Sequence, residues 1–93
     1  MSVEVRIPTV LRPAMGGRST VVAQGVTIGE VLGFLSDSYP ASSDQLLDAD
    51  GALHRFLNVY LNDDDVRYLG GLDTPVADGD EVTLLPAVAG GAE

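Results

Sequence analysis

Few residues of this chain have the type and spacing that enzyme chemistry requires. His54 is the single histidine, and no serine stands in a pattern that would pair with it as nucleophile and base. The run Asp63-Asp64-Asp65 could attract a hard cation, but it lacks the ligand spacing of a calcium loop. Such acidic runs are typical of solvated turns. We therefore expect no catalytic residue and no metal ligand, and the chain is not predicted to be an enzyme.

The side chains most used in covalent chemistry are missing as well. The sequence contains neither cysteine nor lysine, so no side chain can supply a thiolate or a primary amine. The glycine-rich patterns that cradle phosphates, G-x-G-x-x-G and G-x-x-x-x-G-K-[ST], do not occur. The chain is therefore expected to bind no cofactor itself.

One glycine pair has no evident structural purpose. The pairs Gly16-Gly17 and Gly70-Gly71 lie between predicted elements, where turns account for them. Gly90-Gly91 has no predicted element after it. A segment without Cβ atoms can enter a narrow channel in another protein, and a glycine carboxylate becomes an electrophile once it is adenylated. It could then accept sulfur or an amine; the alternative is a frayed chain end without function.

Alternation predicts the elements that open the chain. Apolar residues alternate over 3–7 and predict a strand that continues to Leu11. A cluster of proline and glycine predicts a hairpin loop over 12–17. A β-branched run then predicts a second strand over 20–23.

Thr27 begins the predicted main helix. Thr27 and Glu30 have the spacing of a capping box, in which the hydroxyl accepts from a helix amide and the glutamate reaches back. Pro40 ends the helix. The apolar residues recur at helical spacing on one face: Ile28, Val31, Leu32, Leu35 and Tyr39. This face is expected to pack under a sheet.

The second half of the chain supplies the remaining strands. Residues 41–55 are polar and irregular, with one turn expected at 44–47, and Asn and Asp predict a tight turn over 62–65. Strands are predicted at 57–61, 66–68 and 81–85.

This order of elements, β-β-α-β-β-β, predicts a fold of the α+β class. The last strand can lie parallel to the first through a right-handed crossover, which is the ubiquitin-like (β-grasp) arrangement. We expect a mixed sheet of four to five strands with one main helix across a face. The predicted β-grasp domain spans residues 1–86, and a flexible C-terminal arm spans residues 87–93.

Composition and charge limit the partners. The 93 residues suffice for one domain, and the 45% of hydrophobic residues is a globular proportion. Five arginines against fourteen acidic residues give a net charge of −9, concentrated in the second half. Such a charge repels nucleic acid and anionic membranes and attracts basic protein surfaces. With no signal sequence or apolar span evident, we expect a cytoplasmic protein.

Three stretches of the sequence carry a resemblance to a known family: residues 5–13, 54–67 and 78–91. The last reads D-G-D-E-V-x-x-x-P-x-V-x-G-G, which is far more specific than a terminal diglycine. On these motifs the chain resembles the MoaD/ThiS family of ubiquitin-like sulfur carriers. Within that family it resembles the actinobacterial carriers of cysteine biosynthesis.

The resemblance implies partners that do the chemistry. An E1-like adenylyltransferase and sulfurtransferase would use ATP to activate the carrier and load it with sulfur. A PLP-dependent cysteine synthase acting on O-phosphoserine would accept the sulfur, and a zinc metalloprotease of the JAB1/MPN type would release cysteine. Related carriers serve molybdopterin, thiamin-thiazole or thiosugar synthesis. ATP, PLP and zinc would belong to these partners.

The resemblance also implies roles for the tail. Gly91 would carry the adenylate and then the thiocarboxylate. The residues that would thread the partner's channel are Val88, Ala89 and Gly90. The chain continues past Gly91, so Ala92 and Glu93 are expected to be removed by a protease; the alternative is an inactive copy.

Leu85 matches an outward hydrophobic position that family members press into the activating enzyme; the alternative is ordinary sheet packing. Two rival functions stay open at this point. One is a ubiquitin-like modifier that is joined to the lysines of target proteins. The other is a plain binding module whose diglycine is incidental.

Overall fold

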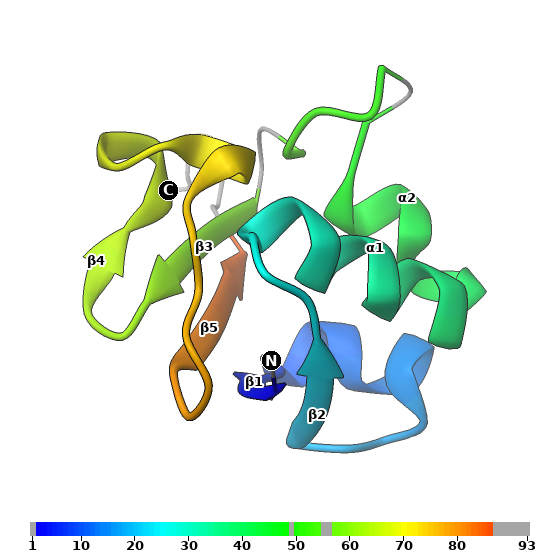
Figure 1. The fold of residues 1–93 in the computed structure, drawn as a ribbon. Helices are drawn as coiled ribbons and strands as arrows, with labels where there is room; N and C mark the ends of the chain where they lie inside the picture. Colours follow the sequence, from blue (N-terminus) through cyan, green and yellow to red (C-terminus); the bar gives the residue numbers. More distant parts are fainter. Residues whose placement is uncertain (1, 49, 55–56, 87–93) are drawn as a thin grey trace.

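A mixed sheet with five strands is the framework of the computed structural model, which describes residues 2–48, 50–54 and 57–86. The strand order across the sheet is β2-β1-β5-β3-β4 (Figure 1). The bounds of the strands are β1 Ser2–Arg6, β2 Thr20–Gln24, β3 Leu57–Leu61, β4 Asp64–Asp65 and β5 Glu81–Pro86.

The first and last of these strands lie side by side in the middle of the sheet. β1 pairs parallel with β5, as Val5 lies opposite Val82, and antiparallel with β2. β3 pairs antiparallel with both β5 and β4. The predicted parallel pairing of the last strand with the first is therefore confirmed, and β5 is the central strand from which the tail continues.

Helix α1, Ile28–Ser38, covers one face of this sheet. The Thr27 hydroxyl accepts a hydrogen bond from the Glu30 amide at 3.2 Å, as the capping box predicts. The Glu30 carboxylate reaches back to the amide of Val26, one residue before the cap, at 3.0 Å. The N-terminal capping is therefore confirmed.

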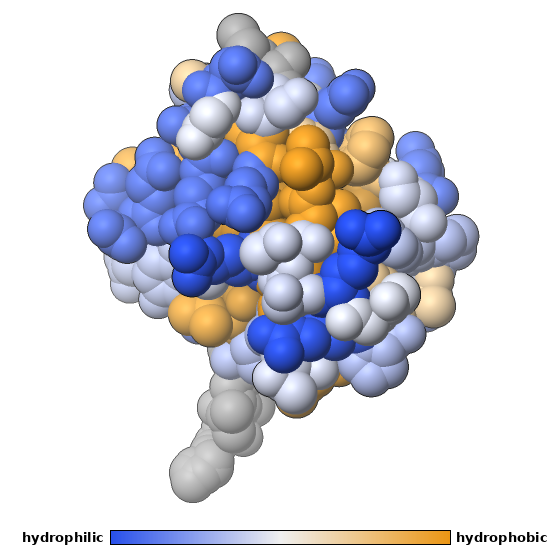
Figure 2. Space-filling model, turned by 90° about the horizontal axis from the view of Figure 1, so that it is seen from below, coloured by the Kyte–Doolittle hydropathy of each residue, from blue (hydrophilic) through white to orange (hydrophobic). Residues whose placement is uncertain are grey.

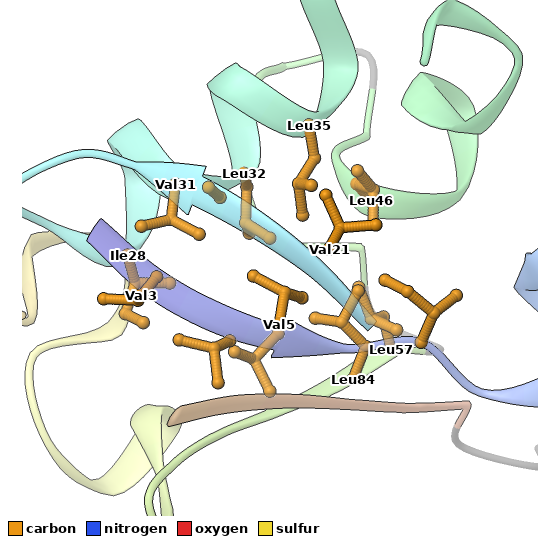
Figure 3. Close-up of a cluster of buried hydrophobic side chains, with 14 of the residues drawn as sticks. Val3, Val5, Val21, Ile28, Val31, Leu32, Leu35, Leu46, Leu57 and Leu84 are labelled. Atoms are coloured by element: carbon orange, nitrogen blue, oxygen red, sulfur yellow. The ribbon is translucent and has the colours of Figure 1, made fainter. Parts of the chain in front are cut away.

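The core lies between α1 and the inner face of the sheet (Figure 3). Four residues of the predicted helix face are buried, and Tyr39 packs against the cluster from its edge. The strands contribute alternate residues that meet them. The residues of this core that Figure 3 labels are Val3, Val5, Val21, Ile28, Val31, Leu32, Leu35, Leu46, Leu57 and Leu84.

The first strand is shorter than its sequence pattern predicts. β1 ends at Arg6, and Thr9–Met15 forms a 3-10 helix, η1, where we expected a strand to Leu11 and then a hairpin loop. Pro8 has no amide to donate to the β2 ladder, and the amide of Leu11 instead donates to the Pro8 carbonyl at 3.0 Å. Leu11 and Met15, four residues apart, are thereby buried in the core.

The fourth strand also lies earlier than predicted. Asn62 adopts the left-handed conformation, with φ 58°, so the chain reverses over two residues and pairs again at Asp64–Asp65. Val66–Tyr68, predicted as a strand, is the 3-10 helix η3. The Asp65 carboxylate begins it by accepting from the Arg67 amide at 2.9 Å.

Short helices complete the connections. The predicted turn after α1 is confirmed as α2, Ser43–Leu46, which buries Leu46 and follows the 3-10 helix η2, Pro40–Ser42. A further 3-10 helix, η4, spans Gly71–Asp73. The arrangement of strands and helix is the ubiquitin-like β-grasp fold, so the predicted fold class is confirmed. Within the described ranges, no helix is long and apolar enough to cross a membrane.

Candidate functional site

The base of the predicted tail is the end of β5. The parallel ladder with β1 extends only to Thr83, whereas the antiparallel ladder with β3 continues to Pro86, opposite Leu57. The tail therefore follows from a central strand whose last residues have a strand neighbour on one side. The predicted sulfur-bearing, channel-threading and processed residues lie outside the described residues: Val88, Ala89, Gly90, Gly91, Ala92 and Glu93.

Leu85 points to the outer face of the sheet, as predicted. Its side chain is 43% exposed, whereas its neighbour Leu84 is 1% exposed and belongs to the core. On β3 its cross-strand partner is Asn58. The outward position of Leu85 is confirmed, and its contact with a partner stays a prediction.

A hollow of about 250 Å³ lies beside Leu85 on this outer face. Its lining comes from β3, β5 and the turn after β3, and we call it the β3–β5 hollow: Tyr60, Asn62, Asp63, Thr83 and Leu85. Tyr60 and Thr83 are cross-strand partners. The hollow thus extends from the Asn62-Asp63 turn to the residue before Pro86.

Asn62 fixes the turn at one end of the hollow. Its amide donates to the Glu81 carbonyl at 2.7 Å, and its Oδ1 atom accepts from the Glu81 amide at 3.1 Å. The turn is therefore held against the first residue of β5. Sequence reasoning identified the turn but not this second role of Asn62, because no local pattern encodes a bond across nineteen residues.

Arg67 stabilises the neighbouring part of the outer face. Its Nη1 atom donates to Oδ1 of Asn58 at 2.8 Å, and its Nη2 atom donates to the His54 carbonyl at 3.0 Å. Arg67 thus connects η3 to the strand that flanks Leu85. The sequence resemblance included Arg67 in a matching stretch but assigned it no role.

The surface of the molecule mixes charged and apolar residues. On the face of the molecule shown in Figure 2, hydrophilic residues predominate and surround a smaller hydrophobic area. Glu4 lies opposite Glu81 in the β1–β5 ladder, and Arg6 donates to the Glu81 carboxylate at 2.6 Å. The Arg6 side chain is 61% exposed, so the ion pair contributes little to stability. Its effect is to neutralise one of two adjacent carboxylates.

The acidic and histidine side chains of the described residues lie in separate places. No group of three or more His, Cys, Asp or Glu residues among them could hold a metal ion. Asp63 belongs to the turn after β3, and Asp64 and Asp65 form β4. His54 lies apart from them, in a groove between η1, α2 and the end of β5.

Comparison with known proteins identifies a family and several similar sulfur carrier proteins. The family model described as ThiS family matches residues 5–91. The chain is 55% identical over 93 residues to the sulfur carrier protein CysO of Mycobacterium tuberculosis, covering 98% of this chain and 100% of that protein. The crystal structure of M. tuberculosis CysO superposes with a TM-score of 0.85 at 53% identity, covering 92% of this chain and 99% of that one.

Two further relatives bear on partners. The Amycolatopsis orientalis CysO, solved as a BexX/CysO complex, matches with a TM-score of 0.87 at 47% identity, covering 96% of this chain and 99% of that one. The small archaeal modifier protein 3 of Haloferax volcanii is 34% identical over 93 residues, covering 98% of this chain and 100% of that protein.

Proposed function

This chain belongs to the ThiS family of sulfur carriers, and on that premise we propose that it bears sulfur as a thiocarboxylate on Gly91. As a member of a carrier family it is not an enzyme. The observation that supports the proposal is that central strand β5 ends at Pro86, five residues before Gly91. Five residues, when fully extended, span about 17 Å, and this length is available to reach into a partner protein.

The proposed chemistry takes place on the Gly91 carboxylate inside an E1-like adenylyltransferase. A carboxylate oxygen attacks the α-phosphate of ATP, and pyrophosphate leaves. Hydrosulfide then attacks the acyl carbon of the adenylate, and AMP leaves, so that Gly91 carries a thiocarboxylate. The chain contributes the electrophilic carbon and a backbone without Cβ atoms at Gly90 and Gly91, which suits a narrow channel.

We propose that Ala92 and Glu93 are removed first. The Gly91 carboxyl group is in peptide linkage to Ala92 and has no free oxygen to attack ATP. Hydrolysis of this one bond releases a dipeptide and creates the required carboxylate. The intact Val-Ala-Gly-Gly motif at 88–91 supports processing over an inactive copy.

For the acceptor we propose cysteine biosynthesis. A PLP-dependent synthase acting on O-phosphoserine would receive the sulfur, and a JAB1/MPN-type zinc metalloprotease would release cysteine from the carrier. The 55% identity to the mycobacterial sulfur carrier CysO supports this pathway. The BexX/CysO complex supports a carrier of this type docking on a separate protein. The same carrier chemistry would serve molybdopterin, thiamin-thiazole or thiosugar synthesis.

A second candidate function is protein modification. The 34% identity to a small archaeal modifier protein supports it. The same activated Gly91 would then be attacked by a target lysine instead of by sulfur. Conjugates of Gly91 with other proteins in cell lysate would favour this function over the first.

Intact-mass spectrometry tests the proposal. Two forms of the chain, ending at Gly91 and at Glu93, are incubated with ATP, sodium sulfide and the cognate activating enzyme. We expect a gain of about 16 Da, oxygen exchanged for sulfur, only on the form that ends at Gly91. A gain on the longer form without loss of Ala92 and Glu93 contradicts processing. No gain on either form, with an enzyme shown to be active, contradicts the carrier function.

A further inference from the structure

The β3–β5 hollow contains polar groups that the fold does not use. Asn62 is engaged with Glu81, but Asp63 is exposed, and its carboxylate has no hydrogen bond or ion pair with any described residue. The Tyr60 hydroxyl likewise has no such partner within the described ranges. A carboxylate and an aromatic ring therefore line the same hollow and are available to a ligand.

The lining matches the three parts of an arginine side chain. A guanidinium group stacks on aromatic rings, and Tyr60 is the aromatic residue of the lining. Its N–H groups donate to a carboxylate, here that of Asp63. Its alkyl stem packs on apolar atoms, which Leu85 and the Thr83 methyl group supply. A lysine ammonium would use the carboxylate but would lose the planar stacking.

The position of the hollow indicates which protein supplies the arginine. Leu85 forms its wall and is the residue before Pro86, so a protein that receives the tail must lie next to the hollow. The net charge of −9 favours a partner with a basic surface. We propose that the β3–β5 hollow binds an arginine side chain of the activating enzyme, and we call this binding site the arginine seat. This proposal rests on the proposed function.

Binding of the chain ending at Gly91 to its activating enzyme tests this seat. Asp63→Asn removes the carboxylate and keeps the shape of the side chain, and we expect affinity to fall about fivefold or more. Tyr60→Leu removes the ring, with an expected loss of about two- to fivefold. Asp64→Asn is the matched control, because it removes the same charge one residue away, outside the hollow, and should change affinity by less than about twofold.

A double variant shows whether Asp63 and Tyr60 contact the same arginine or contribute to affinity independently. If Asp63 and Tyr60 hold the same arginine, the loss in the double variant is smaller than the product of the two single losses. Strictly multiplicative losses contradict a shared side chain. Equal losses for Asp63→Asn and Asp64→Asn overturn the proposal and leave only a general attraction between charges. Thermal unfolding of each variant shows that the fold is retained.

The gain of about 16 Da on the chain ending at Gly91 is measured in parallel and tests the carrier function separately.

A second experiment tests the hollow without the enzyme. The peptide acetyl-Gly-Arg-Gly-amide is titrated against the chain and compared with the same peptide containing citrulline, its neutral analogue. Chemical-shift changes centred on Tyr60, Asp63 and Leu85 that are larger with arginine support the seat. Equal changes with both peptides overturn it, whatever the outcome of the mass measurement.

Discussion

Gly29 of α1 lies directly against the backbone of Leu72, so that a Cβ atom at position 29 would be 3.2 Å from the Leu72 carbonyl oxygen. This approach brings η4 against the first turn of the helix. Gly33, one turn further along, has no neighbour within 4 Å of such a Cβ atom. Two glycines of one helix thus have different roles.

Substituting these glycines with alanine distinguishes the roles. Gly33→Ala should stabilise the protein by about 0.5–1 kcal/mol, because alanine has the higher helix propensity and no contact is disturbed. Gly29→Ala should gain less or destabilise, because the Leu72 backbone must move. Urea unfolding measures both free energies. A Gly29→Ala variant that is stabilised as much as Gly33→Ala would show that the contact with η4 is not restrictive.

Substitution of Leu32 tests the packing of the core between α1 and the sheet. Its side chain is fully buried between α1 and the strands (Figure 3). Leu32→Ala should lower the free energy of unfolding by about 2–5 kcal/mol, since it leaves a cavity that neighbouring side chains fill only in part. The control is Leu85→Ala, which removes an exposed side chain and should cost much less. A loss below about 0.5 kcal/mol for Leu32→Ala would contradict the core assignment.

Asn62 combines a left-handed backbone with two hydrogen bonds to Glu81. Asn62→Ala should cost about 1–3 kcal/mol, because alanine is strained at φ 58° and the Oδ1 acceptor is lost. Asn62→Gly removes the acceptor but tolerates the backbone, so its loss should be smaller. The difference between the two, from thermal or urea unfolding, measures the strain. Equal losses would assign the whole effect to the side-chain hydrogen bond.

Association with the activating enzyme should depend on salt. Residues 56–91 carry seven acidic residues and one arginine, and exposed charges accelerate the encounter with a basic surface. The Debye length falls from about 10 Å at 0.1 M to about 3 Å at 1 M ionic strength. Stopped-flow or surface-based kinetics should therefore show a falling association rate constant over this range. An unchanged rate constant would exclude steering, although the carrier function would survive.

Gly91→Ala tests the need for a narrow tail. In the chain ending at residue 91, this change should leave thermal unfolding unaltered, because the core lies within residues 3–84. Adenylation, followed as pyrophosphate release, should fall sharply, because the added Cβ atom crowds the threaded backbone. Normal turnover of the alanine variant would mean that the partner's channel does not select for glycine.

Local patterns account for the parts of the fold that the sequence predicted well. The helix from Thr27 to Pro40 has a cap, an apolar face and a stop signal, and all three are local. The alternation of residues 81–85 predicted that Leu84 and Leu85 lie on opposite faces of β5, whereas the outward position of Leu85 came from the resemblance to the family. These signals depend on residues within a few positions of one another.

The features that the sequence predicted wrongly or did not predict depend on contacts between residues that are distant in sequence. The alternation over 3–7 suggested a strand that continues to Leu11, whereas the burial of Leu11 and Met15 against distant elements favours a 3-10 helix. The β3–β5 hollow requires Tyr60 to lie beside Thr83, a pairing across two strands that composition does not specify. The roles of Asn62 and Arg67 were missed for the same reason.

The parallel pairing of β1 with β5 also determines where a label or a solid support can be attached to the protein. The Ser2 carbonyl accepts a hydrogen bond from the Gly79 amide, just before β5 begins, so Ser2 lies a full strand length, about 17 Å, from Pro86. The sequence has no lysine, which leaves the α-amino group as its one amine. An amine-reactive dye or bead therefore attaches at a single point next to Ser2, which lies at the end of the sheet opposite Pro86. A carrier immobilised in this way is held from the end of the sheet opposite Pro86, so that the end of β5 is not used for attachment in a surface-based assay of its partners.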